Sequence, residues 1–355
     1  MPLEGQLPVA PRERLLDRHS TRKKMIPPDR KLTAVFFLHL SVSILPTIKV
    51  WLQAGHRISA VVVASQRWPT PIENPIQWFA LRWVVKRYLH SNRIQIIEIG
   101  RASEWEQLRE RLAQGHPDVA ICYAFMRLLP EKMLSLFPCG ALNFHPALLP
   151  FYRGPKPLPW LAMNNDWDAH GGVTLHEMSN AFDQGPIVAQ APMRETRAKD
   201  NLTHFVSNAM ACMARDVIPK YCAGEVSALP QPSGVYPYAS LDVPQPAFDE
   251  KWTRDHLRLL CKVFVRRPGI TIAVSGTSVR LSEEIADLGP PSGERPIARR
   301  WTVDFDLADR RVRYRRHTAY AKLRSNLRLL RQMFPRPIEE VFILLGPSGE
   351  AGSQG

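Results

Sequence analysis

The sequence has few cysteines, and none of them lies in a metal-binding pattern. The five cysteines include no C-x-x-C pair, and the chain has no H-E-x-x-H motif and no ligand spacing among its cysteines and histidines. An odd number of unpaired cysteines is typical of reduced, buried thiols in a cytosolic protein. We therefore expect no metal, and a cytoplasmic location.

Two nucleotide-binding signatures and any long apolar run are also missing. No glycine-rich dinucleotide fingerprint follows the first predicted strand, and no phosphate-cradling G-K-[ST] loop occurs. No segment approaches the ~20 apolar residues that a membrane span needs, so no membrane partner is expected. The apolar stretch 32–45 follows a basic leader and has no small-residue cleavage site after it, so it is predicted to contain a strand rather than a signal sequence.

The composition is that of a globular protein with an excess of positive charge. Hydrophobic residues make up 45% of the 355 residues and charged residues 23%, which allows about two to three domains. The net charge of +14 favours an anionic partner, such as nucleic acid, a phosphorylated substrate or the poly-anionic tail of a cofactor. A solvated basic surface without any partner is the equally weighted alternative.

Short apolar runs alternate with helical patterns through the first part of the chain. Helices are predicted between the runs, and the alternation indicates an α/β fold with a doubly wound, mostly parallel sheet. A later helix is expected at about 200–222. The runs that read as buried strands are 32–39, 58–64, 94–99, 118–123 and 139–145.

The pattern changes after residue 225. A proline- and glycine-containing stretch is followed by a helix at about 253–264 and by short strand patterns at 270–274, 277–281, 301–307 and 312–316, which predict a smaller β-rich domain. The expected organisation is a flexible basic leader at 1–30, a catalytic domain at 31–225, a linker at 226–246, a small β-rich C-terminal domain at 247–335 and a tail at 336–355.

The candidate chemistry begins at the end of the fifth predicted strand. Residues two apart on a strand point to the same face, so Asn143 and His145 should project together. Pro146 ends the strand, which puts both side chains at its carboxyl end, where open parallel sheets bind ligands. An isolated Asn-x-His triplet is more often structural, so a partner from another segment is needed.

Asp183 is the candidate partner. A strand-like run at 173–178 leads into a loop whose Asp-x-Gly turn could return a carboxylate over the sheet. The alternative is an ordinary turn aspartate that caps backbone amides. The candidate catalytic set is therefore Asn143, His145 and Asp183.

Taken together, these segments resemble the folate-dependent formyltransferase family. The Asn-x-His pair is followed by Leu-Leu-Pro at 148–150, Tyr-Arg-Gly at 152–154, a Gly-Val-Thr strand at 172–174 and an Asp-x-Gly-x-Ile loop at 183–187. All occur in the family's order, with 38 positions from His145 to Asp183. The likeness is dense over 118–192, looser over 32–117, and faint over 246–320, where it is to the second domain of methionyl-tRNA and sugar formyltransferases.

The resemblance implies a formyltransferase-type Rossmann-like fold with 10-formyltetrahydrofolate as co-substrate. An amine would attack the formyl carbon, and Asn143 and a protonated His145 would donate to the formyl oxygen. Asp183 would keep His145 cationic and could position a water that carries protons. The residues implied to line the pteridine pocket are Met126, Arg127, Leu128 and Leu129, and those implied to border the folate are Ala147, Leu148, Leu149 and Pro150.

Two departures bear on the acceptor. Ala147 stands where many family members have serine, and the segment 66–87 lacks the glycine- and lysine-rich insertion common in methionyl-tRNA formyltransferases. From residue 295 to 336 the chain has 13 Lys/Arg and three acidic residues. This basic segment could contact an RNA backbone, or it could be a solvated basic face. We favour the solvated face slightly.

The leading expectation is therefore a small-molecule amine acceptor, such as an amino sugar or a secondary-metabolite amine, with methionyl-tRNA as the alternative. A formyltetrahydrofolate hydrolase is a third reading, although the 30-residue leader is too short for the regulatory domain that the compared hydrolases usually have. A non-enzymatic nucleic-acid-binding protein on the same fold is a fourth, and the intact Asn, His and Asp argue against it. The sequence gives no oligomeric state.

Overall fold

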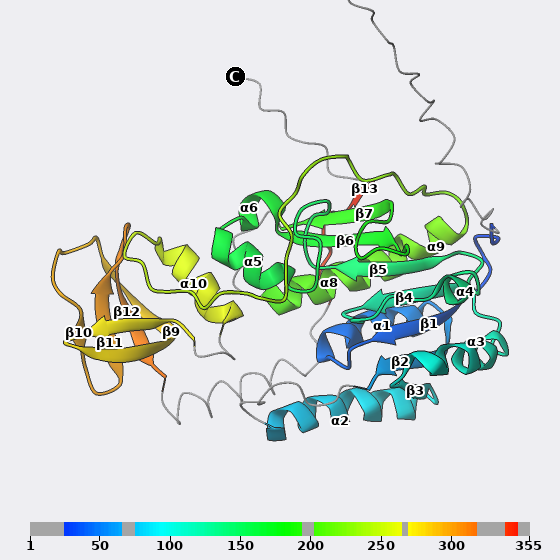
Figure 1. The fold of residues 1–355 in the computed structure, drawn as a ribbon, viewed down its shortest axis with the longest axis horizontal. Helices are drawn as coiled ribbons and strands as arrows, with labels where there is room; N and C mark the ends of the chain where they lie inside the picture. Colours follow the sequence, from blue (N-terminus) through cyan, green and yellow to red (C-terminus); the bar gives the residue numbers. More distant parts are fainter. Residues whose placement is uncertain (1–24, 66–74, 194–201, 265–268, 318–337, 347–355) are drawn as a thin grey trace, which may run out of the picture.

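The computed structural model describes residues 25–65, 75–193, 202–264, 269–317 and 338–346. Most of the predicted leader, part of the predicted C-terminal domain and the end of the tail lie outside these ranges. The larger of the two sheets contains five parallel strands that agree with the predicted ones (Figure 1). These are β1 (Thr33–Leu38), β2 (Arg57–Ala64), β3 (Gln95–Ile99), β4 (Val119–Tyr123) and β5 (Ala141–His145).

The strand order is β13-β7-β6-β5-β4-β1-β2-β3. The chain first builds outward from β1 to β3 and then returns to place β4 on the other side of β1. This reversal between β1 and β4 is the switch point at which open α/β sheets bind ligands, outside the carboxyl ends of the strands. The expected doubly wound, mostly parallel sheet is confirmed.

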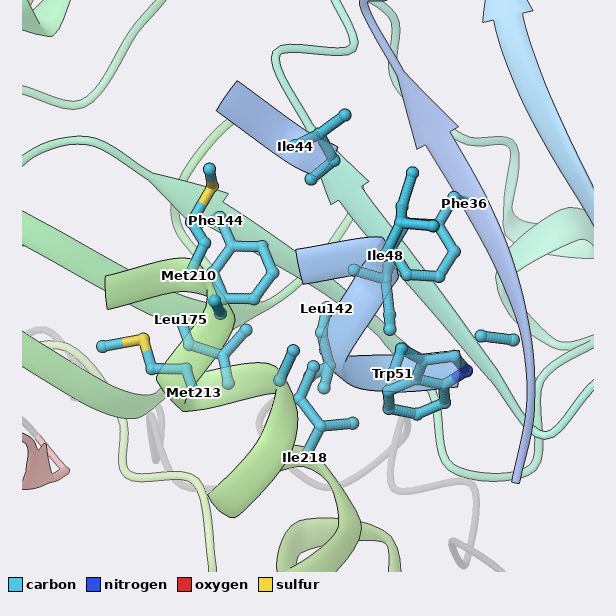
Figure 2. Packing of buried hydrophobic residues seen from close by; sticks show 14 of the residues in the cluster. Phe36, Ile44, Ile48, Trp51, Leu142, Phe144, Leu175, Met210, Met213 and Ile218 are labelled. Carbon is cyan, nitrogen blue, oxygen red and sulfur yellow. The ribbon is translucent and has the colours of Figure 1, made fainter. Parts of the chain in front are cut away.

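Helices cover both faces of this sheet. One face carries α1 (Leu45–Gln53), preceded by the short 3-10 turn η1 (Val42–Ile44), and also α2 (Pro75–Ser91), α8 (Leu202–Asp216) and α9 (Ile218–Cys222). Figure 2 shows Trp51 and Ile48 of α1 and Met210 of α8 packed over the apolar side chains of the strands. The other face carries α3 (Trp105–Ala113), preceded by η2 (Ala102–Glu104), and α4 (Glu131–Leu134).

Three antiparallel strands extend the sheet beyond β5. They are β6 (Gly172–Glu177), β7 (Ile187–Pro192) and β13 (Leu344–Leu345). The last strand falls in the segment that the sequence assigns to a tail, and it pairs with β7 while Ile338, Val341 and Ile343 pack against the main core. A two-residue strand carries no periodicity of its own, so only its partner reveals it.

The smaller sheet is antiparallel, with the order β10-β11-β12-β9-β8. Its members are β8 (Thr271–Val274), β9 (Thr277–Gly289), β10 (Ile297–Ala298), β11 (Thr302–Asp306) and β12 (Arg311–Arg316), and α10 (Arg254–Val263) packs on it. Thr253 caps α10 by accepting a hydrogen bond from the His256 amide at 3.3 Å. Strand β9 runs eight residues beyond its predicted end at Leu281.

The smaller sheet shares a core with the larger domain. Two further helices, α5 (Pro157–Asn164) and α6 (Trp167–His170), follow β5, and their apolar side chains lie in one cluster with those of α10 and the smaller sheet. Among the described helices, none has the length and apolarity to cross a membrane.

The segment that joins α9 to α10 is fixed to the catalytic domain (Figure 1). Leu229 pairs with Ile187 at the start of β7, and Tyr238 forms a parallel bridge with Arg153. Ala239 donates its amide to the carbonyl of Arg153 at 2.7 Å. The predicted linker is therefore an ordered strap along the edge of the domain that holds the predicted catalytic residues.

Candidate active site

Alternation along β5 separates the core side chains from the candidate catalytic ones. Leu142 and Phe144 point into the main core with α1 and α8 (Figure 2). Because strand side chains alternate, Asn143 and His145 point to the opposite face, at the carboxyl end of the strand. The sequence predicted this orientation.

The third candidate residue reaches the same place from the loop between β6 and β7. Asp183 has a left-handed backbone, with φ of 53°, which is uncommon for a residue other than glycine. Its Oδ2 accepts a hydrogen bond from the amide of Gly154 at 2.9 Å, which ties it to the loop after β5. Its Oδ1 turns toward the two side chains of β5.

The side chains of Asn143 and His145 converge on one carboxylate oxygen of Asp183. Asp183 Oδ1 lies 3.5 Å from Nδ1 of His145 and 3.4 Å from Nδ2 of Asn143. The side chains are 4% exposed for His145 and 11% for Asp183, so little water screens the cluster. The structure thus brings together the amide, imidazole and carboxylate named from the sequence.

A fourth polar residue, His176, completes the cluster. It lies on β6 directly opposite Asn143, and its Nε2 is 3.0 Å from Asn143 Nδ2 and 3.5 Å from Asp183 Oδ1. Its Nδ1 faces the carbonyl of Glu177 at 2.8 Å and therefore donates, which leaves Nε2 as the acceptor of the Asn143 amide. The sequence shows His176 on the Gly-Val-Thr strand, but its register against β5 comes only from the antiparallel pairing.

The ring of His145 is held from both ends. Its Nε2 donates to the carbonyl of Tyr152 at 2.8 Å, so Nδ1 is the nitrogen that faces Asp183. Burial lowers the pKa of His145 below its ordinary 6.5, and the attraction of Asp183 only partly opposes this. The sequence-based expectation that Asp183 keeps His145 cationic is therefore wrong for the free protein, because desolvation of the ring outweighs the ion pair.

Asp183 stays ionised. Burial by itself raises the pKa of Asp183, but the attraction of its carboxylate to the protonated forms of His145 and His176, together with the Gly154 amide, lowers it well below its ordinary value. At neutral pH the cluster therefore holds one ionised carboxylate, which accepts hydrogen bonds from the Gly154 amide and, more weakly, from Asn143.

The loop expected to border the folate is largely internal. Ala147, Leu148 and Leu149 are buried, and so is Pro150, which follows a cis peptide bond. Thr174 donates to the carbonyl of Ala147 at 2.6 Å and accepts from the amide of Leu149 at 3.0 Å. These residues determine the path of the chain beside His145, and the contact with folate stays a prediction.

The loop expected to hold the pteridine follows β4. Met126 and Leu128 are 48% and 36% exposed, whereas Leu129 is buried. Arg127 donates to the carbonyl of Gly100 at 2.9 Å, which fixes the loop against the end of β3. Met126 and Arg127 line a hollow at the carboxyl ends of β1, β2 and β4, together with His39 and Arg82.

Residues 86–211 match the protein family described as Formyl transferase. This stretch contains β4, β5, β6 and β7 and therefore every residue of the candidate catalytic cluster.

Solved structures share the fold at low sequence identity. WlaRD, a sugar 3N-formyl transferase, is 13% identical with a TM-score of 0.55 over 81% of this chain and 98% of that one. An N-formyltransferase from Helicobacter canadensis, solved with folinic acid and dTDP-3-aminofucose, is 14% identical with a TM-score of 0.55 over 81% and 100%. HypX from Aquifex aeolicus with tetrahydrofolic acid is 17% identical with a TM-score of 0.51 over 80% and 44%.

The matched domain and the shared fold agree with the resemblance drawn from the motifs. Residues 86–211 therefore form a formyl transferase domain, which makes the chain a formyl-transferring enzyme, and the chain as a whole has a formyltransferase-type fold.

Proposed function

We propose that this enzyme transfers a formyl group from 10-formyltetrahydrofolate to the amine of a small molecule, and that a nucleotide-linked amino sugar is the first acceptor to test. The observation that supports this most is the convergence of Asn143, His145 and His176 on the carboxylate of Asp183 at the carboxyl end of β5. An amide donor can stabilise the charge that develops on a formyl oxygen, and an imidazole beside an ionised carboxylate can accept the proton of an attacking amine.

Asn143 has one hydrogen available for the formyl oxygen. Its amide nitrogen donates to His176 at 3.0 Å and, more weakly, to Asp183 at 3.4 Å. A substrate oxygen on which negative charge develops would compete with Asp183 for the second hydrogen. Such a donor, fixed in advance by His176, stabilises the charge at little reorganisation cost.

His145 acts in this proposal as the proton acceptor. Because its pKa lies below 6.5, the ring is neutral at pH 7, and its Nε2–H is occupied by the Tyr152 carbonyl. The free lone pair is then on Nδ1, beside Asp183. A proton taken from the attacking amine would be held between Nδ1 and the carboxylate, which stabilises the imidazolium as it forms. The same proton would then pass to the folate nitrogen as the bond between that nitrogen and the formyl carbon breaks, so the products are the formylated amine and tetrahydrofolate.

The formyl donor supplies an activated one-carbon group, and the chain has surfaces that suit it. Met126 and Leu128 present exposed apolar side chains on the loop after β4, which a flat heterocyclic ring would cover. Two structural neighbours were solved with folinic acid and with tetrahydrofolic acid, which supports a folate donor.

A small acceptor is favoured over RNA by the pairing of arginines in the smaller sheet. Arg313 and Arg299 contact Asp304 at 2.6 and 3.3 Å, and Arg315 contacts Glu283 at 3.1 Å. Arg311 binds Asp306 at 2.8 Å. Cations that are already neutralised by carboxylates contribute little to a phosphate-backbone surface. One structural neighbour is a sugar 3N-formyl transferase and another was solved with dTDP-3-aminofucose, which supports a sugar nucleotide.

The test is a panel of acceptors incubated with 10-formyltetrahydrofolate. The panel contains amino-sugar nucleotides, simple amines and charged initiator tRNA, and a reaction without acceptor measures hydrolysis. We expect formylation of at least one small amine well above the acceptor-free rate. Formylation of the tRNA alone, or hydrolysis at the same rate with and without acceptors, would contradict the proposal.

A further inference from the structure

The strap that follows α9 places one amide side chain against the loop of Asp183. Gln231 donates through Nε2 to the backbone carbonyls of Asp183 and Gly185, both at 2.8 Å. Its Oε1 accepts from Nε and Nη2 of Arg153 at 2.9 and 2.6 Å. The side chain is partly buried, and all of these hydrogen bonds cross from the strap to the catalytic domain.

We infer that Gln231 is a positioning residue for formyl transfer, which acts by holding the Asp183 carboxylate in reach of His145 and Asn143. The inference rests on the proposed function of the cluster. It extends that function to a residue outside the matched family segment, in a part of the chain that the sequence indicated only as a linker.

The hydrogen bonds of Gln231 close a ring around the carboxylate. Arg153 is adjacent in sequence to Gly154, and the Gly154 amide donates to Asp183 Oδ2 at 2.9 Å. One side of the ring thus runs from the Asp183 carbonyl through Gln231 to Arg153, and the other from Gly154 to the Asp183 carboxylate. Both the backbone and the side chain of Asp183 are therefore fixed to the same pair of residues.

Asp183 needs such a constraint because its backbone is left-handed. A φ of 53° strains the backbone of an L-residue and persists only where the surroundings over-determine it. The donors from Gln231 hold the carbonyls on both sides of Gln184, so they oppose relaxation of this turn. Relaxation would turn Oδ1 away from its 3.5 Å contact with His145.

The kinetic test compares Gln231→Leu with Gln245→Leu. Gln245 lies on the same strap and donates to the carbonyl of Gly269, on the side of the smaller sheet, so it is the matched control. We expect Gln231→Leu to lower kcat ~10–100-fold because a displacement of ~1 Å can cost that much. The KM for the formyl donor should stay nearly constant, and Gln245→Leu should leave both parameters near the wild-type values.

A double-mutant cycle separates positioning from general structural support. In an Asp183→Asn background, Gln231→Leu should cost less than ~3-fold further, since its effect acts through the carboxylate already removed. An equal loss in both backgrounds, or a loss confined to KM, would overturn the inference. Gln231→Glu keeps an acceptor for Arg153 but loses both donors, so it should resemble Gln231→Leu.

A third measurement does not depend on activity. The Gly154 amide is protected by the Asp183 carboxylate, so its hydrogen exchange reports the carboxylate position. Gln231→Leu should accelerate this exchange at least ~10-fold, with no change in Gln245→Leu. Unchanged exchange would refute the positioning role even if the enzyme is active. Accelerated exchange in a protein that formylates nothing would instead refute the proposed function alone.

Discussion

His145 lies between a carbonyl that fixes one ring nitrogen and a carboxylate that faces the other. His145→Ala removes the proposed proton acceptor while leaving the loop after β4 intact. We expect turnover to fall at least ~100-fold, with folate binding retained in a fluorescence titration. His90→Ala, at the exposed end of α2, is the matched control and should turn over normally. Near-normal turnover of His145→Ala would contradict its assignment.

The pKa of His145 gives the reaction a definite pH dependence. The neutral ring is the active form, so the rate should fall as the pH drops through a pKa below 6.5. The Asp183 carboxylate raises this pKa, and Asp183→Asn should therefore lower it further. Titration of the ring by NMR in both proteins checks the sign. A higher pKa in Asp183→Asn would refute the described electrostatics.

Gly185 has no room for a side chain. A Cβ at this position would lie 1.8 Å from the carbonyl oxygen of Glu177, at the end of β6. Gly185→Ala should therefore displace the loop that carries Asp183, lowering stability by about 3 kcal/mol and reducing activity. Gly276→Ala is the comparison, because nothing lies within 4 Å of a Cβ at this position. Only the left-handed φ of 77° of Gly276 opposes the substitution, and it should lower stability by about 1–2 kcal/mol. Equal thermal shifts in the two variants would contradict this account.

At the scale of elements, the sequence predicted those parts whose signal is local. Alternation along β5 placed Asn143 and His145 on one face, and five apolar runs became the five parallel strands. The contribution of His176 was missed because it depends on the register between β5 and β6. The pKa direction of His145 was missed because burial is a property of the packed molecule.

The contribution of strand β13 to the stability of the fold can be tested by truncation. Ending the chain at residue 337 removes the partner of β7, the packing of Ile338, Val341 and Ile343, and the contact of Glu340 with Arg215 at 2.9 Å. Three half-buried aliphatic side chains are worth about 3 kcal/mol together. We expect thermal unfolding to begin several degrees lower, since ~1 kcal/mol shifts Tm by ~2–4 °C in a chain of this size. An unchanged Tm would show that β13 adds no stability.

At the scale of the whole molecule, the two sheets do not have independent cores. Leu161 of α5 and Trp167 of α6 lie in the same buried cluster as Leu257 and Leu260 of α10. Their mutual burial extends the core of the catalytic domain into the smaller one. The two parts should therefore unfold together.

Calorimetry can check this cooperativity. The full chain should show one transition, and a chain ending at residue 246 should unfold at a clearly lower temperature than the chain ending at residue 337, because both lack β13 and only the shorter one exposes the apolar sides of α5 and α6. The loss corresponds to about 5 kcal/mol for a few large buried side chains. Two well-separated transitions in the full chain would contradict a shared core.

The ordered strap also determines at which residue a chimaera of this enzyme and a relative should cross over. A chimaera that exchanges the C-terminal portion at residue 226 would replace Gln231 and Tyr238 while keeping the Asp183 and Arg153 that they contact. A crossover after residue 246 would transfer the smaller sheet and leave those pairings native. Acceptor grafting between homologues should therefore treat residues 226–246 as inherited with the catalytic half.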